Sequence, residues 1–526
     1  MQSRVLGRVS GVRRILGAAI VALAIIATLV ATIVVSSQAA LAQGTHSGTL
    51  RVGWTPPIKL DPAFFGDAPD ASIGMAVYDR LFVTDQKGAL VPSLASAYKV
   101  SDDGKTVTLT LQSGVKFHDG SAFSADDVKF TLDRLMDAKL GSSAKSLLTD
   151  VDKVDVVDPA TVKITLKNPS AALLLNLTDY HMFILKKGTV DPSKEFNGTG
   201  PFKTSADQID LTTHATFVAN ENYWQAGLPK VAKLEMTFNK DVSALVQALK
   251  GGQLDFVARV PIELYADLQK DSNITPIDIP TNLFPNIRLR ADRKPGSDPN
   301  VREAFRLAID RDALNKTLYN GLAATGYDDP VGPYYKSLFT KPAAFPARDV
   351  AKAKELLKTA GYADGLTIDL YAPQGEFNSD DLAQALQQQL KEAGITVNIH
   401  LVEGGTYYDD KQKNNWLDAD FAITGWATRP DPQAFFVQMY RSDGVWNEAH
   451  WNDPEVDKLI DQAGQEVDVA KRQAILSKIQ DIMIARGPSF IPFFRPLLAG
   501  QSSKVTGIEV FGDPGLTNFA GATIAQ

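Results

Sequence analysis

The chain has 526 residues, of which 44% are hydrophobic and 22% charged, with no cysteine and a formal net charge of −7. This length exceeds what one hydrophobic core serves, so two or three globular units are expected. The acidic balance argues against nucleic acid as a partner, and the lack of cysteine excludes disulfides and thiolate chemistry.

Residues 1–42 have the layout of a secretory signal peptide. Four arginines precede an apolar run over residues 15–35, and Ala40-Leu41-Ala42 forms a small-residue cleavage site. Removal of this segment takes the net charge from −7 to −11, because it carries four Arg and no acid. The run is also long enough to span a bilayer, so an uncleaved anchor is the alternative. With no cysteine to carry a lipid, we expect a periplasmic protein that is not a lipoprotein.

The clearest local pattern lies in residues 90–136. Residues 106–111 alternate threonine with Val107, Leu109 and Leu111, which predicts a strand with one buried face. Asp102-Asp103-Gly104 before it is typical of a tight turn. Ser124, with Asp127 three residues later, predicts a capped helix start.

This segment resembles the signature of family 5 bacterial extracellular solute-binding proteins, the peptide- and nickel-type receptors of ABC importers. The shared features are LAxxYxVSDDGKTxTxxLxxGVKFHDGxxFxADDV, and residues 197–202, 220–224 and 301–314 match further family motifs. The Gly-rich residues 197–202 lack the GK[ST] of a nucleotide cradle, which favours a turn before a strand. The resemblance implies that the loop after the first strand edges a ligand cleft, where Trp54 is a candidate contact. The alternative for Trp54 is a core aromatic residue.

From residue 299 onward, helices and strands alternate. Helices are predicted over 351–359 and 381–393, and strands over 367–371 and 395–401. Such alternation favours a mostly parallel sheet covered on both faces, with ligands at the carboxyl ends of the strands.

The sequence and the resemblance together predict an α/β, two-lobed periplasmic binding protein fold of the class II type. Lobe I is expected to comprise residues 43–284 and 494–526, with an extra subdomain inserted at 83–196. Lobe II is expected to comprise residues 285–493. Two chain crossings, near 284–290 and 488–496, would form the hinge.

Residues 421–436 hold the strongest candidates for ligand choice, because an apolar strand runs into a loop made rigid by proline. In family members that take peptides, a Trp of this loop packs on the ligand and an Asp accepts its ammonium group. Trp426 matches that Trp, while Arg429 stands near the expected Asp and is a candidate fork for a carboxylate or phosphate. The alternative for Arg429 is a charge at the rim of the cleft. Asp431 is the remaining acid, or else the cap of a helix starting at Gln433.

Glu376 follows the strand predicted at 367–371, where peptide-type relatives carry a basic residue. If Glu376 binds an amine and Arg429 an acid group, the ligand would lie with reversed polarity, which is a hypothesis. Tyr407 and Trp446 are further aromatic candidates for the cleft wall, with Tyr334 and Trp451. Each of these rings could equally be part of the packing.

The chain lacks the motifs of common hydrolases. Its six His form no HExxH, there is no GxSxG, and no cysteine is available as a nucleophile. We expect neither catalytic residues nor a metal or cofactor, and therefore no enzyme. The expected function is a monomeric receptor that captures a di- or oligopeptide and delivers it to the membrane subunits of an ABC permease. Alternatives are a receptor for a sugar, opine or metal chelate, a secreted two-domain hydrolase, and a periplasmic chaperone.

Overall fold

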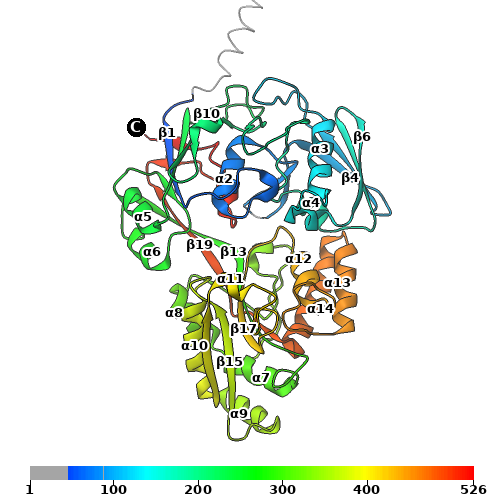
Figure 1. The fold of residues 1–526 in the computed structure, drawn as a ribbon, viewed down its shortest axis with the longest axis vertical. Coiled ribbons are helices and arrows are strands. Elements are labelled where there is room, and N and C mark those ends of the chain that lie inside the picture. The colour runs from blue at the N-terminus through cyan, green and yellow to red at the C-terminus, as the bar shows by residue number, and fades with distance from the viewer. Residues whose placement is uncertain (1–45, 87, 526) are drawn as a thin grey trace, which may run out of the picture.

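The computed structural model describes residues 46–86 and 88–525. It has two lobes, one above the other in Figure 1, joined by the long strands β13 and β19. The predicted signal peptide, residues 1–42, lies outside the described residues. Within the described ranges, each helix is too short or too polar to cross a membrane.

One large sheet runs through both lobes, in the order β16-β15-β17-β13-β19-β12-β1-β11-β10-β8. In that order the strands are Ile395–Val402, Leu366–Pro373, Phe421–Trp426, Ile274–Leu289, Phe493–Ser502, Phe256–Val257, Thr49–Trp54, Lys233–Phe238, His214–Ala219 and Phe202–Lys203. Three short strands attach beside this path: β9 (Ile209–Asp210), β14 (Ala324–Thr325) and β18 (Ser489–Phe490).

The hinge is an antiparallel ladder of β13 and β19, which we call the hinge ladder (residues 274–289 and 493–502). Pairing runs from Ile274 opposite Ser502 to Leu283 opposite Arg495, with a shift of register just before Leu283. At this shift the Thr281 hydroxyl donates to the Arg495 carbonyl at 2.6 Å and accepts from the Leu283 N–H at 2.9 Å. Beyond it, β13 pairs with β17. Hydrogen-bonded backbone therefore connects the lobes without a flexible linker.

Lobe I comprises the elements before β13 and after β19, within residues 46–86, 88–273 and 503–525. A separate sheet, in the order β4-β5-β7-β6, packs against α3 on one side of this lobe. The predicted capped start of α3 is confirmed, because the Ser124 N–H donates to Asp127 Oδ2 at 2.8 Å. The elements of lobe I outside the large sheet are η1 (Pro62–Phe64), α2 (Ala68–Val77), β2 (Phe82–Thr84), β3 (Leu90–Pro92), β4 (Ala95–Val100), β5 (Thr106–Leu111), α3 (Ala125–Met136), η2 (Ser143–Leu148), β6 (Val151–Asp158), β7 (Thr161–Leu166), α4 (Leu173–Asn176), η3 (Ala206–Gln208), α5 (Val242–Lys250), α6 (Ile262–Leu268), β20 (Val505–Thr506), η6 (Pro514–Leu516) and β21 (Thr523–Ile524).

Lobe II comprises residues 290–492, between the two hinge strands. Its strands β15, β16 and β17 pair in parallel, as the alternating pattern predicts, whereas β17 meets the hinge strand β13 antiparallel. Its core gathers apolar side chains such as Phe305, Leu370 and Ile395. The helices are α7 (Pro299–Ala308), α8 (Arg311–Tyr319), η4 (Pro333–Tyr335), α9 (Val350–Thr359), α10 (Ser379–Glu392), α11 (Gly404–Tyr407), α12 (Gln433–Phe435), η5 (Phe436–Tyr440), α13 (Pro454–Gln465) and α14 (Val469–Arg486).

Two of the motifs that carry the resemblance meet at a partly buried junction after α2, which we call the motif junction (Asp79, Thr199, Tyr223 and Trp224). The Asp79 carboxylate accepts hydrogen bonds from the Thr199 hydroxyl at 2.9 Å, the Tyr223 hydroxyl at 3.0 Å and Trp224 Nε1 at 2.9 Å. Burial raises the pKa of Asp79 to about 6, although these bonds favour the charged form. At Gly198 an added Cβ would lie 2.0 Å from the Val77 carbonyl oxygen, so this approach requires glycine.

Candidate ligand-binding site

A cavity of about 620 Å³ lies between the lobes beside the hinge ladder, which we call the cleft cavity. Its walls come from loops of both lobes and from the point where β19 crosses between them. Its lining includes Asp67, Tyr180, Arg259, Ile262, Glu263, Tyr319, Glu376, Phe377, Asn378, Arg429, Arg495 and Asp513. A site built in this way changes shape when the lobes move relative to one another.

Arg495 brings a cation from the hinge strand β19 into the cleft cavity. Its guanidinium lies 5.6 Å from the centre of the Phe377 ring and 5.8 Å from that of Tyr319. In the described part of the chain it forms no ion pair with a carboxylate, and its buried Nε has no hydrogen-bond partner. Because a buried donor without a partner is costly, the arrangement is suited to an anionic ligand group.

Two predicted residues of lobe II also face the cleft cavity with unpaired charges. Arg429 and Glu376 are both half-buried, and neither forms an ion pair within the described residues. The Arg429 guanidinium lies 6.0 Å from the ring centre of Trp426, and its backbone carbonyl accepts the Tyr335 hydroxyl at 2.8 Å. The loop backbone is therefore held while the charged end stays available.

Lobe I contributes a paired set of charges to the opposite wall. Arg259 forms an ion pair with Asp67 at 2.5 Å, and Asp513 also lines the cavity. Burial raises the pKa of Asp513, while the positive charge of Arg259 opposes this rise. This wall carries more acid than base, unlike the arginine side of the cavity.

Three lining residues that are not glycine have left-handed backbone conformations. Their φ angles are +55° at Arg259, +52° at Phe377 and +55° at Asn378. A conformation of this kind costs about 1–3 kcal/mol and persists only where the surroundings impose it. Phe377 and Asn378 belong to lobe II and Arg259 to lobe I, so both walls of this cavity hold backbone of this kind, which is typical of ligand sites.

Trp426 and Trp446 lie behind the cavity wall and do not face the space directly. The Trp426 side chain is 4% exposed, and its Nε1 donates to the buried carboxylate of Glu448 at 2.7 Å. Trp446 packs edge-on against Trp426, with ring centres 5.7 Å apart. Both rings therefore support the loop that carries Arg429.

Three other predicted contacts are placed in the core. Asp431 is fully buried and accepts both guanidinium nitrogens of Arg472 at 2.5 and 2.6 Å, in addition to the Gln433 N–H at 2.8 Å. Tyr407 is fully buried and donates to the Ile423 carbonyl at 2.8 Å, and Trp54 is 2% exposed. Since their polar groups or rings are enclosed by protein, these three do not line the cleft cavity.

The cavity also contains residues that sequence reasoning missed, above all Arg495 and Arg259. For Arg495 a signal existed, because it interrupts the apolar return strand Phe493-Phe494-Arg495-Pro496. For Arg259 no motif was available, since its role depends on a left-handed turn beside α6. In the described ranges, no three His, Cys, Asp or Glu side chains form a group that could hold a metal ion.

Comparisons with known proteins agree with this architecture. The family model "Bacterial extracellular solute-binding proteins, family 5 Middle" matches residues 89–447. The glutathione-binding protein GsiB of Pectobacterium atrosepticum is 30% identical over 482 residues, covering 89% of this chain and 92% of the relative. The substrate-binding protein CtaP of Listeria monocytogenes shares the fold, with a TM-score of 0.79 and 24% identity over 90% of this chain and 99% of that one. AgaA of A. tumefaciens R10, solved with agropinic acid, has a TM-score of 0.72 and 26% identity over 91% and 99%.

Proposed function

The chain belongs to the family 5 bacterial extracellular solute-binding proteins, and we propose on this basis that it captures a short peptide and delivers it to an ABC importer. It would act in the periplasm as a monomer, without a nucleic-acid partner and without transforming its ligand. We also propose that the lobes part near Leu283 and Arg495, where the hinge ladder shifts register.

The observation that carries the proposal is the charge pattern of the cleft cavity. The arginine side, with Arg429 and Arg495 unpaired, suits a carboxylate, while Glu376 and the acids of lobe I suit an ammonium group. A volume of about 620 Å³ lies within the usual range for small-molecule sites. A zwitterion of two or three residues meets both requirements, and glutathione, named for the relative GsiB, is of that class.

Capture would proceed by closure of the lobes over the ligand. Among the described residues, two hydrogen bonds cross between the lobes away from the hinge: the Ala171 N–H donates to the Gly464 carbonyl at 2.8 Å, and Lys336 Nζ donates to the Gln86 carbonyl at 2.6 Å. Ala171 lies just before α4, and Gly464 lies in α13. Figure 1 shows these two helices facing each other across the gap between the lobes. Ligand contacts with both walls would favour the closed arrangement over an open one.

A second candidate ligand is an organic acid that is not a peptide. Three arginines line the cavity, and AgaA, 26% identical, was solved with agropinic acid. An acid without an amine would leave Glu376 without a cationic partner, so the zwitterion is the better match.

Mass spectrometry of the ligand that co-purifies with the protein, followed by calorimetric titration, tests the proposal. We expect S-methylglutathione or trialanine to bind with a Kd near or below about 10 μM, which corresponds to roughly −7 kcal/mol. Amidation of the peptide's carboxylate should weaken binding at least tenfold. Stoichiometric recovery of intact peptide would support a receptor, whereas turnover would support a hydrolase. Tighter binding of an amine-free organic acid than of either peptide would contradict the proposal.

A further inference from the structure

A second cavity, of about 490 Å³, opens beside the cleft cavity between α6 of lobe I and α8 and α10 of lobe II. We call it the side groove. It shares Ile262, Glu263 and Asn378 with the lining of the cleft cavity, so the two spaces adjoin. A ligand held in the cleft could therefore continue into the groove without crossing the core.

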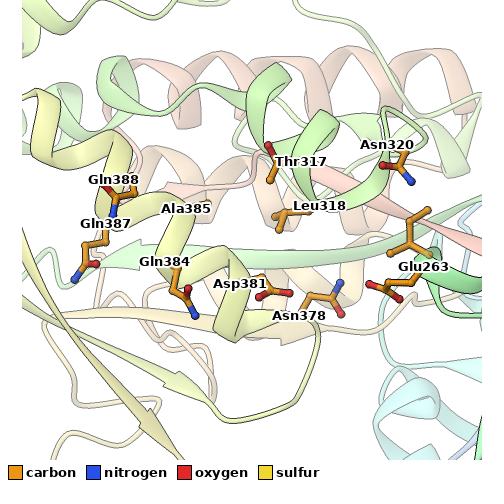
Figure 2. A pocket seen from close by; sticks show the side chains of 11 residues that line it. Glu263, Thr317, Leu318, Asn320, Asn378, Asp381, Gln384, Ala385, Gln387 and Gln388 are labelled. Atoms are coloured by element: carbon orange, nitrogen blue, oxygen red, sulfur yellow. The ribbon is translucent and has the colours of Figure 1, made fainter.

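The groove follows one face of α10. Figure 2 shows Asn378, Asp381, Gln384 and Gln388 one after another along this helix, with Asn378 nearest to Glu263. Residues three and four apart lie on the same face of a helix, which explains the continuous stripe. Ten residues of helix extend about 15 Å, enough for roughly four residues of extended peptide.

The lining is polar and largely without internal partners. The side-chain amides of Asn320, Gln384 and Gln388 are exposed to solvent and form no hydrogen bond within the described part of the chain, whereas Gln387 Nε2 donates to the Val397 carbonyl at 2.7 Å. Each amide can both donate and accept, as the peptide group does. Such a wall can satisfy the backbone of an extended peptide whatever its side chains are.

The side groove carries only acidic charges among its described lining residues, whereas the cleft cavity carries charges of both signs. Glu263 and Asp381 are the charged side chains that line the side groove in the described structure, whereas the cleft cavity holds Arg429 and Arg495 unpaired. A carboxylate is therefore favoured in the cleft, and an ammonium group or neutral chain in the groove.

We propose that the side groove holds the N-terminal extension of peptides too long for the cleft cavity, while their C-terminal carboxylate stays at Arg495. This inference rests on the proposed function and specifies its ligands: the receptor takes peptides of variable length, open at the N-terminal end. Extension at the C-terminus is excluded, because it would remove the carboxylate from the arginine side.

Single-cysteine labelling tests the orientation, since the natural chain has no cysteine. The Gln388→Cys protein is treated with a bromoacetyl derivative of trialanine or S-methylglutathione. In the N-terminal reagent, two glycines join the bromoacetyl group to the N-terminus of the peptide. In the C-terminal reagent, a diglycyl-diamine joins it to the C-terminus. The thiolate displaces bromide and forms a thioether. Glu355→Cys, on α9 and away from both cavities, is the matched control.

We expect the N-terminal reagent to label the Gln388→Cys protein at least tenfold faster than the C-terminal reagent, and excess unlabelled peptide to suppress this labelling. The Glu355→Cys protein should react slowly and equally with both. In addition, Asp381→Lys should raise the ratio of the Kd for Gly-Gly-Ala-Ala-Ala to that for trialanine about two- to fivefold.

Equal labelling by the two reagents, faster labelling from the C-terminal one, or an unchanged Kd ratio would overturn the inference while leaving the receptor function intact. If neither unlabelled peptide binds the natural protein by calorimetry, the proposed function itself fails. The two failures are thus told apart by a measurement made before any labelling.

Discussion

The motif junction and the cleft cavity use charged residues in opposite ways. At the junction, Asp79 accepts three hydrogen bonds from motif residues that lie more than a hundred positions away in the chain. In the cleft cavity, Arg429, Arg495 and Glu376 form no ion pair within the described residues. The motif residues at this junction therefore belong to the frame, and the unpaired charges that face the cleft cavity lie outside those motifs.

The same contrast occurs within one loop. Asp431 is fully buried against Arg472, whereas Arg429, two positions earlier, faces the cleft cavity with its charge unpaired. If this contrast is correct, substitutions of buried charged residues such as Asp431 should lower stability and leave ligand affinity unchanged. Substitutions of cavity residues such as Arg429 should weaken ligand binding and leave stability unchanged.

The largest expected effect is that of Asp431→Ala. It leaves Arg472, which is 4% exposed, as a buried charge without its partner, and should lower the free energy of unfolding by about 3–5 kcal/mol. Urea unfolding measures the loss, and calorimetry on the folded variant at low temperature measures affinity. A weakening of ligand binding by more than tenfold in protein that is still folded would break the comparison, because it would return Asp431 to the ligand site.

A pH titration sharpens the comparison at the motif junction. The pKa of Asp79 is raised to about 6 by burial, so the folded state binds a proton that the unfolded state releases between about pH 4 and pH 6. The contribution of Asp79 to stability should therefore decrease as pH rises through this window, by at most about 3 kcal/mol. Asp79→Asn removes the titration and serves as the reference in urea unfolding at pH 4, 5, 6 and 7. Parallel pH profiles for the two proteins would show that the junction keeps Asp79 charged throughout.

Local patterns in the sequence predicted the elements of the frame. Alternation over Thr106–Leu111 and the Ser124 cap each depend on neighbouring residues, and both are present in the structure. The alternation of helices and strands after residue 299 likewise predicted the parallel pairing of β15 with β16 and β17. These features were predictable because short-range chemistry decides them.

Sequence patterns predicted the residues of the cleft wall less well. Arg429 and Glu376 were named from the resemblance, at positions that follow strands of lobe II, and both line the cleft cavity. Trp54 and Tyr407 looked like cleft aromatics, yet both are buried, since the burial of a ring depends on contacts distant in sequence. Arg495 and Arg259 depend on a chain crossing and on a left-handed turn, which a single sequence does not display.

Arg495→Met tests the cavity side of the comparison. Methionine retains most of the apolar stem between Phe377 and Tyr319 but cannot donate to a carboxylate. Loss of hydrogen bonds to a charged group costs about 1.5–3 kcal/mol, so the Kd for trialanine should rise roughly 10- to 150-fold. Stability should change by less than about 1 kcal/mol. Arg348→Met, on the outer surface of lobe II, is the matched control. An unchanged Kd would remove Arg495 from the site and would favour Arg429 alone as the anchor.

The smallest expected effect concerns the hydrogen bond from Ala171 to Gly464, which belongs to neither region but holds the lobes together. Ala171→Pro removes the donating N–H, and the net value of one such bond is about 0.5–1.5 kcal/mol. Because the bond exists only when the lobes are in contact, its loss should favour the open arrangement and raise the Kd about two- to tenfold. Lys336→Met, which removes the more exposed cross-lobe bond, should have a weaker effect of the same sign.

Small-angle X-ray scattering of the ligand-free Ala171→Pro protein should show a larger radius of gyration than the natural protein, and saturating peptide should restore it. Urea unfolding should remain within about 1 kcal/mol of the natural protein, since either lobe keeps its own core. A raised Kd with unchanged scattering would mean that the loop before α4 shapes the site directly. In that case Ala171 would belong to the cleft wall as well as to the contact between the lobes, and frame and cleft wall would not be separate in this part of lobe I.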